Sequence, residues 1–569
     1  MAAGDTERFR AARDLLLELR EDHDAAYARF RWPRFETFNW ALDWFDPIAR
    51  DSTREALRIV DGDSVASSTY AELSARSGQA ANWLRGRGVA RGTRVLVMLD
   101  NRLATWEVLL AAMKLGAVVI PTYTTISATD LADRLDRGGV THVITEGVLA
   151  DRFTGIAGDL TRIGVGEPVP GWAPYSDAYA EPADFTPRGA TRADDPLFLY
   201  FTSGTTSRPK LALHTHTSYP VGHLSGMYWT GVRPGDRHLN ISAPGWAKHA
   251  WSSFFAPFNA EATLLTVKTG TAPAPTVLDV LTTQRATTFC APPTVWRMLL
   301  QEDLGRRPVA LREAGSVGEP LNPEVVDRVR RAWGLTVRDG YGQSETTAQI
   351  GNTPGLAVRP GSMGKPLPGY RIVLLDPLTG EPGDEGEICV DLADRPVGVM
   401  PGYLDAPEKN AQTFAGGHYH TGDIGRRDVD GYFTYVGRAD DVFKSYDYRV
   451  SPFELESVLL RHDDVAEVAV VPAPDPIGLV VPKAFVTLAE GRPSSVAVAR
   501  SILRYAREHL APHQWIRRLE FGALPKTMSG KIRRTELRAA EERNGGAGRG
   551  SREYLLDDLL DPTSPPHHP

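Results

Sequence analysis

Short apolar runs alternate with amphipathic stretches through roughly the first 430 residues of this chain. A helical pattern at 104–115 lies between apolar runs at 94–99 and 117–120, and further runs follow at 141–144, 196–200 and 262–267. Strands that alternate with helices in this way form βαβ units around largely parallel sheets. We therefore predict an α/β fold, and a length of 569 residues indicates more than one domain.

After about residue 365 the strands become shorter and richer in turns. From Gly437 onward the pattern predicts a short helix, two strands at 468–471 and 484–488, and a helix at 494–510. This is a compact α+β unit, so we predict a large domain over 1–437 and a smaller one over 438–543. Residues 544–569 have the composition of a disordered tail, with one short helical pattern at 554–560.

Composition excludes several classes of protein. A net charge of -7 argues against nucleic-acid binding, because no basic surplus exists to neutralise phosphates. The apolar stretch at 106–123 contains Glu107 and Lys114 and is too short to span a membrane, and the N-terminus lacks a signal-peptide pattern. Two cysteines, Cys290 and Cys389, are interpreted as buried core thiols in a cytoplasmic protein. Arginine greatly outnumbers lysine, which is typical of a GC-rich bacterial genome.

A loop of small and hydroxylated residues directly follows the apolar run at 198–201. Backbone N–H groups, hydroxyls and a closing lysine in such a loop suit the binding of phosphates. The pattern is not GxxxxGK[ST], because Pro209 precedes the lysine and Leu211 follows it. The alternative is a flexible surface turn. The candidate phosphate ligands are Thr202, Ser203, Gly204, Thr205, Thr206 and Lys210.

This loop resembles the phosphate-binding signature of the adenylate-forming (AMP-binding) superfamily. Five further segments resemble the remaining signatures of that superfamily and occur in the expected order, at 318–321, 339–345, 421–423, 437–441 and 525–532. The segments at 38–43 and 452–456 look like the medium-chain acyl-CoA synthetases. One such peptide could arise by chance, but six in order could not.

The resemblance implies an ATP-dependent carboxylic acid:CoA ligase. A small-molecule acid attacks the α-phosphate to give acyl-AMP and pyrophosphate, and CoA then takes the acyl group. ATP, Mg²⁺ and CoA are the implied cofactors. The domain at 1–437 would bind ATP and the acid, and the mobile domain at 438–543 would turn about a hinge at Asp440.

The resemblance also assigns roles to residues. Catalytic roles are implied for Lys531, Glu345 and Ser344, which replaces the family threonine. Glu345 would hold Mg²⁺ through its carboxylate, and Lys531 would offset the repulsion between the acid and the α-phosphate. Besides the phosphate loop, the implied nucleotide-binding and cofactor-binding residues are Gly318, Glu319, Pro320, Asp339, Gly340, Tyr341, Gly342, Gln343, Asp423, Arg438 and Arg449.

Two residues depart from the family pattern on the side that handles the acceptor. Asp447 stands where the family has glycine, and Gly478 stands where medium-chain enzymes tend to carry arginine. These departures leave open a different acceptor: a carrier-protein thiol, an amine, or nitrite-type activation as in ATP-dependent diazotases. A non-enzymatic nucleotide-binding protein would predict loss of the catalytic residues, which are all present.

The candidate wall of the acid pocket contains Gly245 and Trp246. A tryptophan at this position would shorten the pocket and favour small or aromatic acids. The alternative interpretation is a core tryptophan.

Overall fold

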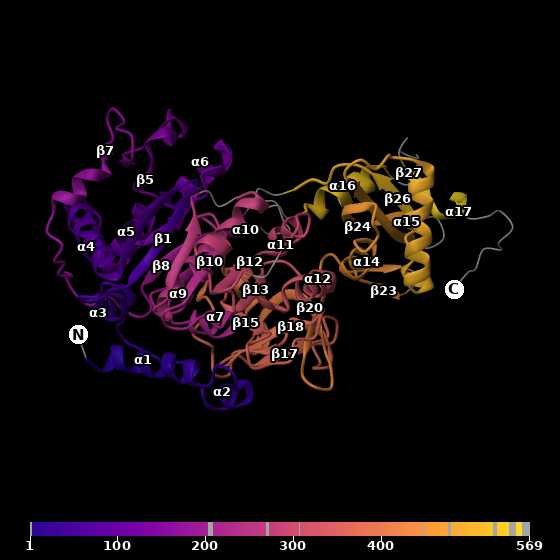
Figure 1. Ribbon diagram of the computed structural model, residues 1–569, viewed down its shortest axis with the longest axis horizontal. Coiled ribbons are helices and arrows are strands. Elements are labelled where there is room, and N and C mark those ends of the chain that lie inside the picture. The colour runs from indigo at the N-terminus through magenta and orange to yellow at the C-terminus, as the bar shows by residue number, and fades with distance from the viewer. Residues whose placement is uncertain are drawn as a thin grey trace. The chain divides into compact units, whose positions relative to one another are not determined.

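The computed structural model describes residues 3–156, 158–202, 209–268, 272–305, 308–445, 448–475, 479–526, 532–544 and 553–559 (Figure 1). Contacts divide the chain into two compact units. The larger unit comprises Met1–Ile372, Val390–His420 and Asp430–Phe433. The smaller unit comprises Val373–Cys389, Thr421–Val429 and Thr434–Pro569. Each unit has its own sheets and its own core.

A nine-stranded sheet forms one half of the larger unit, in the order β16-β15-β14-β13-β12-β10-β11-β1-β2. Strands β14, β13, β12, β10, β11 and β1 run parallel, whereas β2, β15 and β16 are antiparallel to their neighbours. The strands are β1 (Glu55–Asp61), β2 (Ser64–Thr69), β10 (Arg237–Asn240), β11 (Thr263–Val267), β12 (Thr288–Ala291), β13 (Glu313–Val317), β14 (Val337–Gly342), β15 (Ala348–Gly351) and β16 (Lys365–Pro366).

An eight-stranded sheet forms the other half, in the order β19-β9-β8-β4-β3-β5-β6-β7. Its strands from β8 to β7 are parallel, and β9 returns antiparallel beside β8. The strands are β3 (Arg94–Met98), β4 (Val118–Pro121), β5 (His142–Glu146), β6 (Thr161–Val165), β7 (Ala173–Pro174), β8 (Pro196–Thr202), β9 (Lys210–Thr215) and β19 (Gly402–Tyr403).

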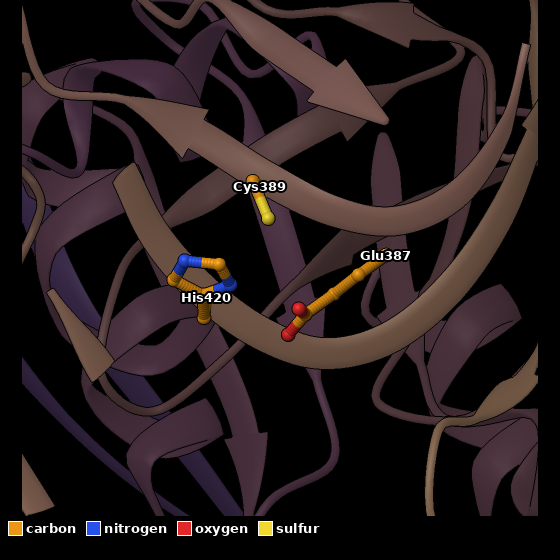
Figure 2. A group of neighbouring side chains, drawn as sticks. All are labelled: Glu387, Cys389 and His420. Carbon is orange, nitrogen blue, oxygen red and sulfur yellow. The ribbon is translucent and has the colours of Figure 1, made fainter. Parts of the chain in front are cut away.

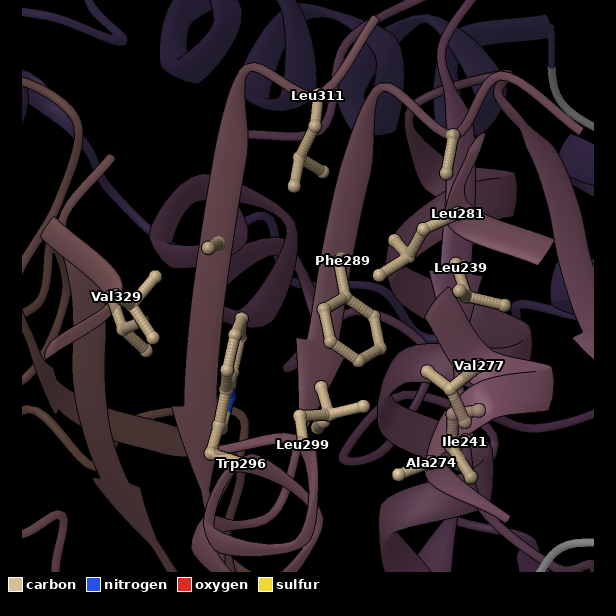
Figure 3. Close-up of a cluster of buried hydrophobic side chains, with 14 of the residues drawn as sticks. Leu239, Ile241, Ala274, Val277, Leu281, Phe289, Trp296, Leu299, Leu311 and Val329 are labelled. Atoms are coloured by element: carbon tan, nitrogen blue, oxygen red, sulfur yellow. The ribbon is translucent and has the colours of Figure 1, made fainter. Parts of the chain in front are cut away.

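Helices cover these sheets because each presents an apolar face to them. Figure 3 shows Phe289, Trp296 and Val329 among the buried side chains that join strands β10–β13 to helices α10–α12. The helices of the larger unit are α1 (Ala3–Glu18), α2 (His23–Arg29), α3 (Asp46–Ala49), α4 (Tyr70–Gly86), α5 (Leu103–Leu115), α6 (Ala128–Arg137), α7 (Leu224–Thr230), α8 (Ala247–Ala250), α9 (Ala256–Asn259), α10 (Ala274–Thr283), α11 (Pro293–Leu299), α12 (Pro323–Trp333) and α13 (Pro407–Thr413).

The smaller unit contains most of one four-stranded sheet, a second four-stranded sheet and a short hairpin. One sheet has the order β17-β18-β20-β21, and the other has the order β24-β25-β26-β27. The elements are β17 (Ile372–Leu375), β18 (Glu385–Asp391), β20 (His418–Arg427), β21 (Phe433–Arg438), the hairpin β22 (Phe443–Ser445) and β23 (Tyr448–Val450), β24 (Val465–Asp475), β25 (Leu479–Leu488), β26 (Arg518–Phe521), β27 (Glu553–Leu555), α14 (Pro452–Leu459), α15 (Val496–His509), α16 (Arg534–Asn544) and α17 (Leu556–Leu559).

The predicted α/β fold class is confirmed, and most predicted strands and helices occur within a few residues of their expected bounds. The start of α12 illustrates why. The Asn322 side chain accepts the Glu324 N–H, and Pro323 occupies the first turn, where its missing N–H costs nothing. The described residues 553–559 of the expected tail form β27 and α17, with Leu556 buried in the core of the smaller unit. None of the helices in the described part of the chain has the length and apolar character that a membrane crossing requires.

Candidate active site

The predicted phosphate loop connects two hydrogen-bonded strands. Thr202 at the end of β8 lies directly opposite Lys210 at the start of β9, where the two strands pair antiparallel. The Lys210 ammonium lies 5.4 Å from the centre of the Tyr403 ring, a cation–π contact. The loop residues Ser203, Gly204, Thr205 and Thr206 lie outside the described residues.

The Glu345 carboxylate is held beside the start of this loop. Its Oε1 accepts hydrogen bonds from the Tyr403 hydroxyl at 2.9 Å and from the Thr202 hydroxyl at 3.2 Å. The Glu345 carbonyl accepts the Met400 N–H at 2.9 Å. A carboxylate and a hydroxyl side by side are hard oxygen donors of the kind that Mg²⁺ prefers. The geometry at Glu345 therefore fits the metal role that the sequence predicts.

The predicted adenine segments follow neighbouring parallel strands. Gly318, Glu319 and Pro320 come directly after β13, and Tyr341 lies near the end of β14. Because β13 and β14 are parallel, both segments lie at the carboxyl edge of the sheet, where ligands of such sheets bind. Gly318 has φ +108°, a conformation that favours glycine, and no atom lies within 4 Å of the point where a Cβ would stand. This edge therefore has open space.

Asp339 is buried on β14, and burial raises the pKa of its carboxyl to about 8. Its Oδ1 accepts the N–H of Gly340 at 3.0 Å. The neighbouring Glu319 carboxylate accepts the Thr294 hydroxyl at 3.1 Å. Hydrogen bonds to the Asp339 carboxylate lower its pKa and so oppose the effect of burial. A hydrogen bond from the amino group of a bound base would also lower this pKa.

Gly342 cannot be replaced without a collision, because a Cβ there would lie 2.3 Å from the Thr347 carbonyl oxygen. The next residue, Gln343, accepts the Tyr419 hydroxyl through Oε1 at 2.6 Å. These contacts hold the chain that leads from the adenine segment to the catalytic residues.

His214 supports Ser344 and was not found by sequence reasoning. Its Nε2 lies 2.8 Å from the Ser344 carbonyl oxygen, and its Nδ1 lies 3.0 Å from the Ser218 hydroxyl. Burial lowers the pKa of this imidazole to about 3, so it is neutral and donates one proton to the Ser344 carbonyl. The available signal was a histidine within the apolar run of β9, but its partner depends on the tertiary fold.

A separate group of predicted ribose ligands lies within the smaller unit. Arg438 Nη1 is 3.1 Å from Asp423 Oδ1, and the Tyr435 hydroxyl is 3.4 Å from the same oxygen. Arg438 Nε also lies 3.5 Å from a carboxylate oxygen of Asp440, the predicted hinge residue. Asp423 and Arg438 are thus paired within one unit, as a joint role would require.

The predicted acid-pocket residues Gly245 and Trp246 lie at the start of α8. Gly245 has φ +101°, and a Cβ would lie 2.3 Å from the backbone nitrogen of Tyr123. This close approach lets the Trp246 ring stack on the Tyr123 ring, with centroids 4.5 Å apart and planes inclined by 5°. Trp246 also lines a cavity of about 20 Å³ with Val97, Leu109 and Phe198. Trp246 is half-buried, so it is not a residue of the interior core.

Both cysteines are buried and free, as predicted. Figure 2 shows Glu387 and Cys389 on β18, with His420 on the neighbouring strand β20. Burial, and then the charge of Glu387, raises the pKa of the Cys389 thiol well above its usual value. The Glu387 carboxylate accepts the Gly422 N–H at 2.8 Å. We assign no metal to this group.

Several predicted residues lack a structural description. Lys531, Asp447 and Gly478 lie outside the described residues, and the side chain of Arg449 is not described. Their predicted roles therefore rest on the sequence alone.

Comparisons with known proteins identify the family of the chain. The AMP-binding enzyme family matches residues 46–404, and the AMP-binding enzyme C-terminal domain matches residues 454–531. The chain is 41% identical over 534 residues to 4-hydroxybutyrate–CoA ligase 1 of Metallosphaera sedula, covering 91% of this chain and 93% of that protein. It is 36% identical over 527 residues to the mitochondrial acyl-coenzyme A synthetase ACSM3 of Mus musculus, covering 89% and 91%.

Solved structures give the same result. An anthranilate CoA ligase, AuaEII, in complex with anthranoyl-AMP aligns with a TM-score of 0.81 at 28% identity, over 90% of this chain and 99% of that one. A benzoate CoA ligase from Burkholderia xenovorans LB400 aligns with a TM-score of 0.76 at 30% identity, over 88% of this chain and 100% of that one.

The fold and the strand-end segments thus define an adenylate-forming enzyme, and the chain belongs to the AMP-binding enzyme family. Within that family it is an AMP-forming acid–thiol ligase, an acyl-CoA synthetase that works through an acyl-AMP intermediate.

Proposed function

We propose that this acyl-CoA synthetase activates a short or small aromatic carboxylic acid. The observation that carries the proposal is the stack of Trp246 on Tyr123, which places two rigid aromatic rings at the candidate acid wall. Gly245 makes the stack possible, because any side chain there would collide with the Tyr123 backbone. The names of two similar proteins, a 4-hydroxybutyrate ligase and a benzoate ligase, support acids of this size.

The nucleotide roles follow from the strand ends. The segment at 318–320 and Tyr341 hold adenine, with Asp339 accepting its amino group, and Asp423 with Arg438 holds the ribose. Thr202 and Lys210 lie at the two ends of the loop that binds the phosphates. Mg²⁺, held by Glu345 near Thr202, would neutralise phosphate charge. Gly342 and Gln343 keep the backbone in place, and Ser344 faces the α-phosphate or the acid.

The chemistry requires two anions to approach each other. Lys531 supplies an ammonium between the carboxylate and the α-phosphate while acyl-AMP forms. The domain over 438–543 then turns about Asp440, and Lys531 gives way to a route for CoA, with Arg449 on that side. One site thereby serves adenylation and thioester formation in turn. The arginine-rich composition and the two free thiols support a bacterial, cytoplasmic setting.

A series of straight-chain acids from two to ten carbons, with benzoate, tests the size limit. Pyrophosphate release and CoA consumption are measured for wild type, Trp246→Ala and a control, Trp172→Ala, in a tryptophan that packs on Phe153. We expect wild type to prefer short acids or benzoate, and Trp246→Ala to shift kcat/KM towards longer acids by roughly tenfold or more. An unchanged chain-length profile in Trp246→Ala would contradict the proposed wall.

A further inference from the structure

Lys248, two residues after Trp246, is a cation that the proposed reaction does not use. Its half-buried side chain donates a hydrogen bond from Nζ to Asn240 Oδ1 at 3.0 Å. Burial lowers the pKa of its ammonium. Among the described residues, no carboxylate lies within ion-pair distance of Lys248, so its one bonded partner is a neutral amide.

Two buried lysines in the described part of the chain have carboxylate partners instead. Lys114 Nζ lies 2.9 Å from an Asp46 carboxylate oxygen. Lys483 Nζ lies 2.6 Å from Glu541 and 2.8 Å from Glu520. A charge removed from water needs an opposite charge or several hydrogen bonds to offset the lost hydration. The half-buried Lys248 ammonium donates to one neutral partner and keeps donors for a further partner.

The position of Lys248 indicates where that partner would be. Asn240 ends β10, and its register partner is Cys290 on β12. The Lys248 ammonium thus lies at the carboxyl ends of these strands. The same parallel sheet presents Gly318 and Tyr341 at this edge. Trp251, which directly follows α8, lies beside the strand end before Ser344, since a Cβ at Gly342 would be 2.6 Å from its ring. An acid whose carboxylate reacts near Ser344 would therefore have its far end near α8.

We propose that Lys248 is a specificity-determining residue that binds a second oxygen acceptor, carried by the acid at the end remote from the reacting carboxylate. A carboxylate or a hydroxyl oxygen can fill this role, since both accept from an ammonium. This inference rests on the proposed acid-binding role of the turn at 245–246.

Three matched four-carbon acids test it: butyrate, 4-hydroxybutyrate and succinate. Binding is measured without ATP, as the rise in Tm with each acid, and turnover is measured as CoA-dependent pyrophosphate release. For wild type we expect at least one oxygen-bearing acid to exceed butyrate in kcat/KM by roughly 10- to 100-fold, the scale of one hydrogen bond to a charged group. The preference between succinate and 4-hydroxybutyrate identifies the oxygen.

Lys248→Met should remove that preference, mainly by raising KM for the oxygen-bearing acid, with butyrate little changed. Asn240→Asp keeps the lysine but gives it an internal carboxylate, and it should weaken succinate more than butyrate. Lys268→Met, at an exposed lysine paired with Asp61, is the control and should retain the preference.

Butyrate binding and turnover equal to both other acids in wild type would overturn the inference, and so would an equal loss for all three acids in Lys248→Met. If the enzyme turns over none of the three acids but still shows selective Tm shifts that depend on Lys248, the proposed ligase substrate is refuted and the Lys248 site is supported. The absence of selective shifts would refute the site itself.

Discussion

At the scale of single residues, the candidate catalytic residues are held by partners from several distant parts of the chain. Thr202 and Tyr403 donate to the Glu345 carboxylate, and His214 supports the carbonyl of Ser344. Each contact joins residues far apart in sequence, so motif patterns alone could identify Glu345 and Ser344 but not their supports. For Lys531, in contrast, the sequence motif alone gives the assignment.

Replacing Lys531 should separate the two half-reactions. Lys531→Ala should slow acyl-AMP formation by roughly 10²–10³-fold, the usual effect of losing one preorganised electrostatic group. It should spare the transfer of the acyl group from supplied acyl-AMP to CoA. Pyrophosphate exchange measures the first step, and thioester formation from synthetic acyl-AMP measures the second. Equal losses in both steps would refute the assignment.

Asp339 should make the stability of the ligand-free protein depend on pH. Its pKa is about 8 in the folded chain, against an ordinary value of 3.8, so the folded chain retains a proton that the unfolded chain loses. Its contribution to the unfolding free energy is therefore complete below about pH 4 and is lost as the pH rises to about 8, by at most about 1.4 kcal/mol per pH unit.

Asp339→Asn removes this titration. Thermal unfolding at pH 5 and pH 8 should show a smaller decrease in Tm for the variant than for wild type. Asp63→Asn, at an exposed turn, is the control and should behave as wild type. Identical decreases in all three proteins would show that Asp339 does not titrate in this range.

At the scale of elements, glycines in the strands of the adenine segment allow a helix to pack closely. Trp229 of α7 is buried, and its Nε1 donates to the Asp339 carbonyl at 3.1 Å. A Cβ at Gly340 would lie 2.3 Å from Trp229 Cε2. The glycines of this segment therefore have a packing role in addition to the nucleotide role that we propose for them.

Gly340→Ala should consequently destabilise the protein by about 1–3 kcal/mol, because the methyl group forces Trp229 out of its packed position. Differential scanning calorimetry should show a lower Tm, and ATP should bind more weakly. Gly86→Ala is the matched control, since nothing lies within 4 Å of the point where its methyl group would stand at the end of α4. A Tm equal to that of Gly86→Ala would contradict the packing role.

Sequence patterns predicted the helices and strands whose own residues form an apolar run or a helix cap. The apolar runs of β3, β4, β8 and β11 and the capped start of α12 are of this kind. Pairing between distant segments was not predictable. Glu553–Leu555 is a strand only because it pairs with β26, where Glu553 bonds Arg518, although its neighbourhood has a tail-like composition. Likewise, only the fold brings Trp246 onto Tyr123.

At the scale of the whole molecule, the candidate residues are divided between two units that each fold around their own core. The acid wall, the adenine segments and Glu345 belong to the larger unit, and Asp423 and Arg438 belong to the smaller one. The proposed hinge residue Asp440 also belongs to the smaller unit, so the hinge is proposed from its sequence motif and not from this division.

Restricting the proposed hinge should block one reaction selectively. Asp440→Pro holds φ near about -65° and so limits rotation at this position. We expect acyl-AMP formation to persist while CoA thioester formation fails, in single-turnover assays of each step. Asp440→Ala, which keeps the rotation, should carry out both steps. Normal thioester formation by the proline variant would place the hinge at another residue.

The origin of the acid wall also bears on how such an enzyme diversifies. Trp246 and Lys248 lie in one short segment after β10, with Trp246 just before α8 and Lys248 within it, whereas the proposed adenine segments lie after β13 and within β14. A few substitutions in that segment can change which acid the enzyme accepts, while the residues proposed to bind ATP stay unchanged. Selection can thus change the acid specificity of the enzyme independently of its use of ATP, within one gene.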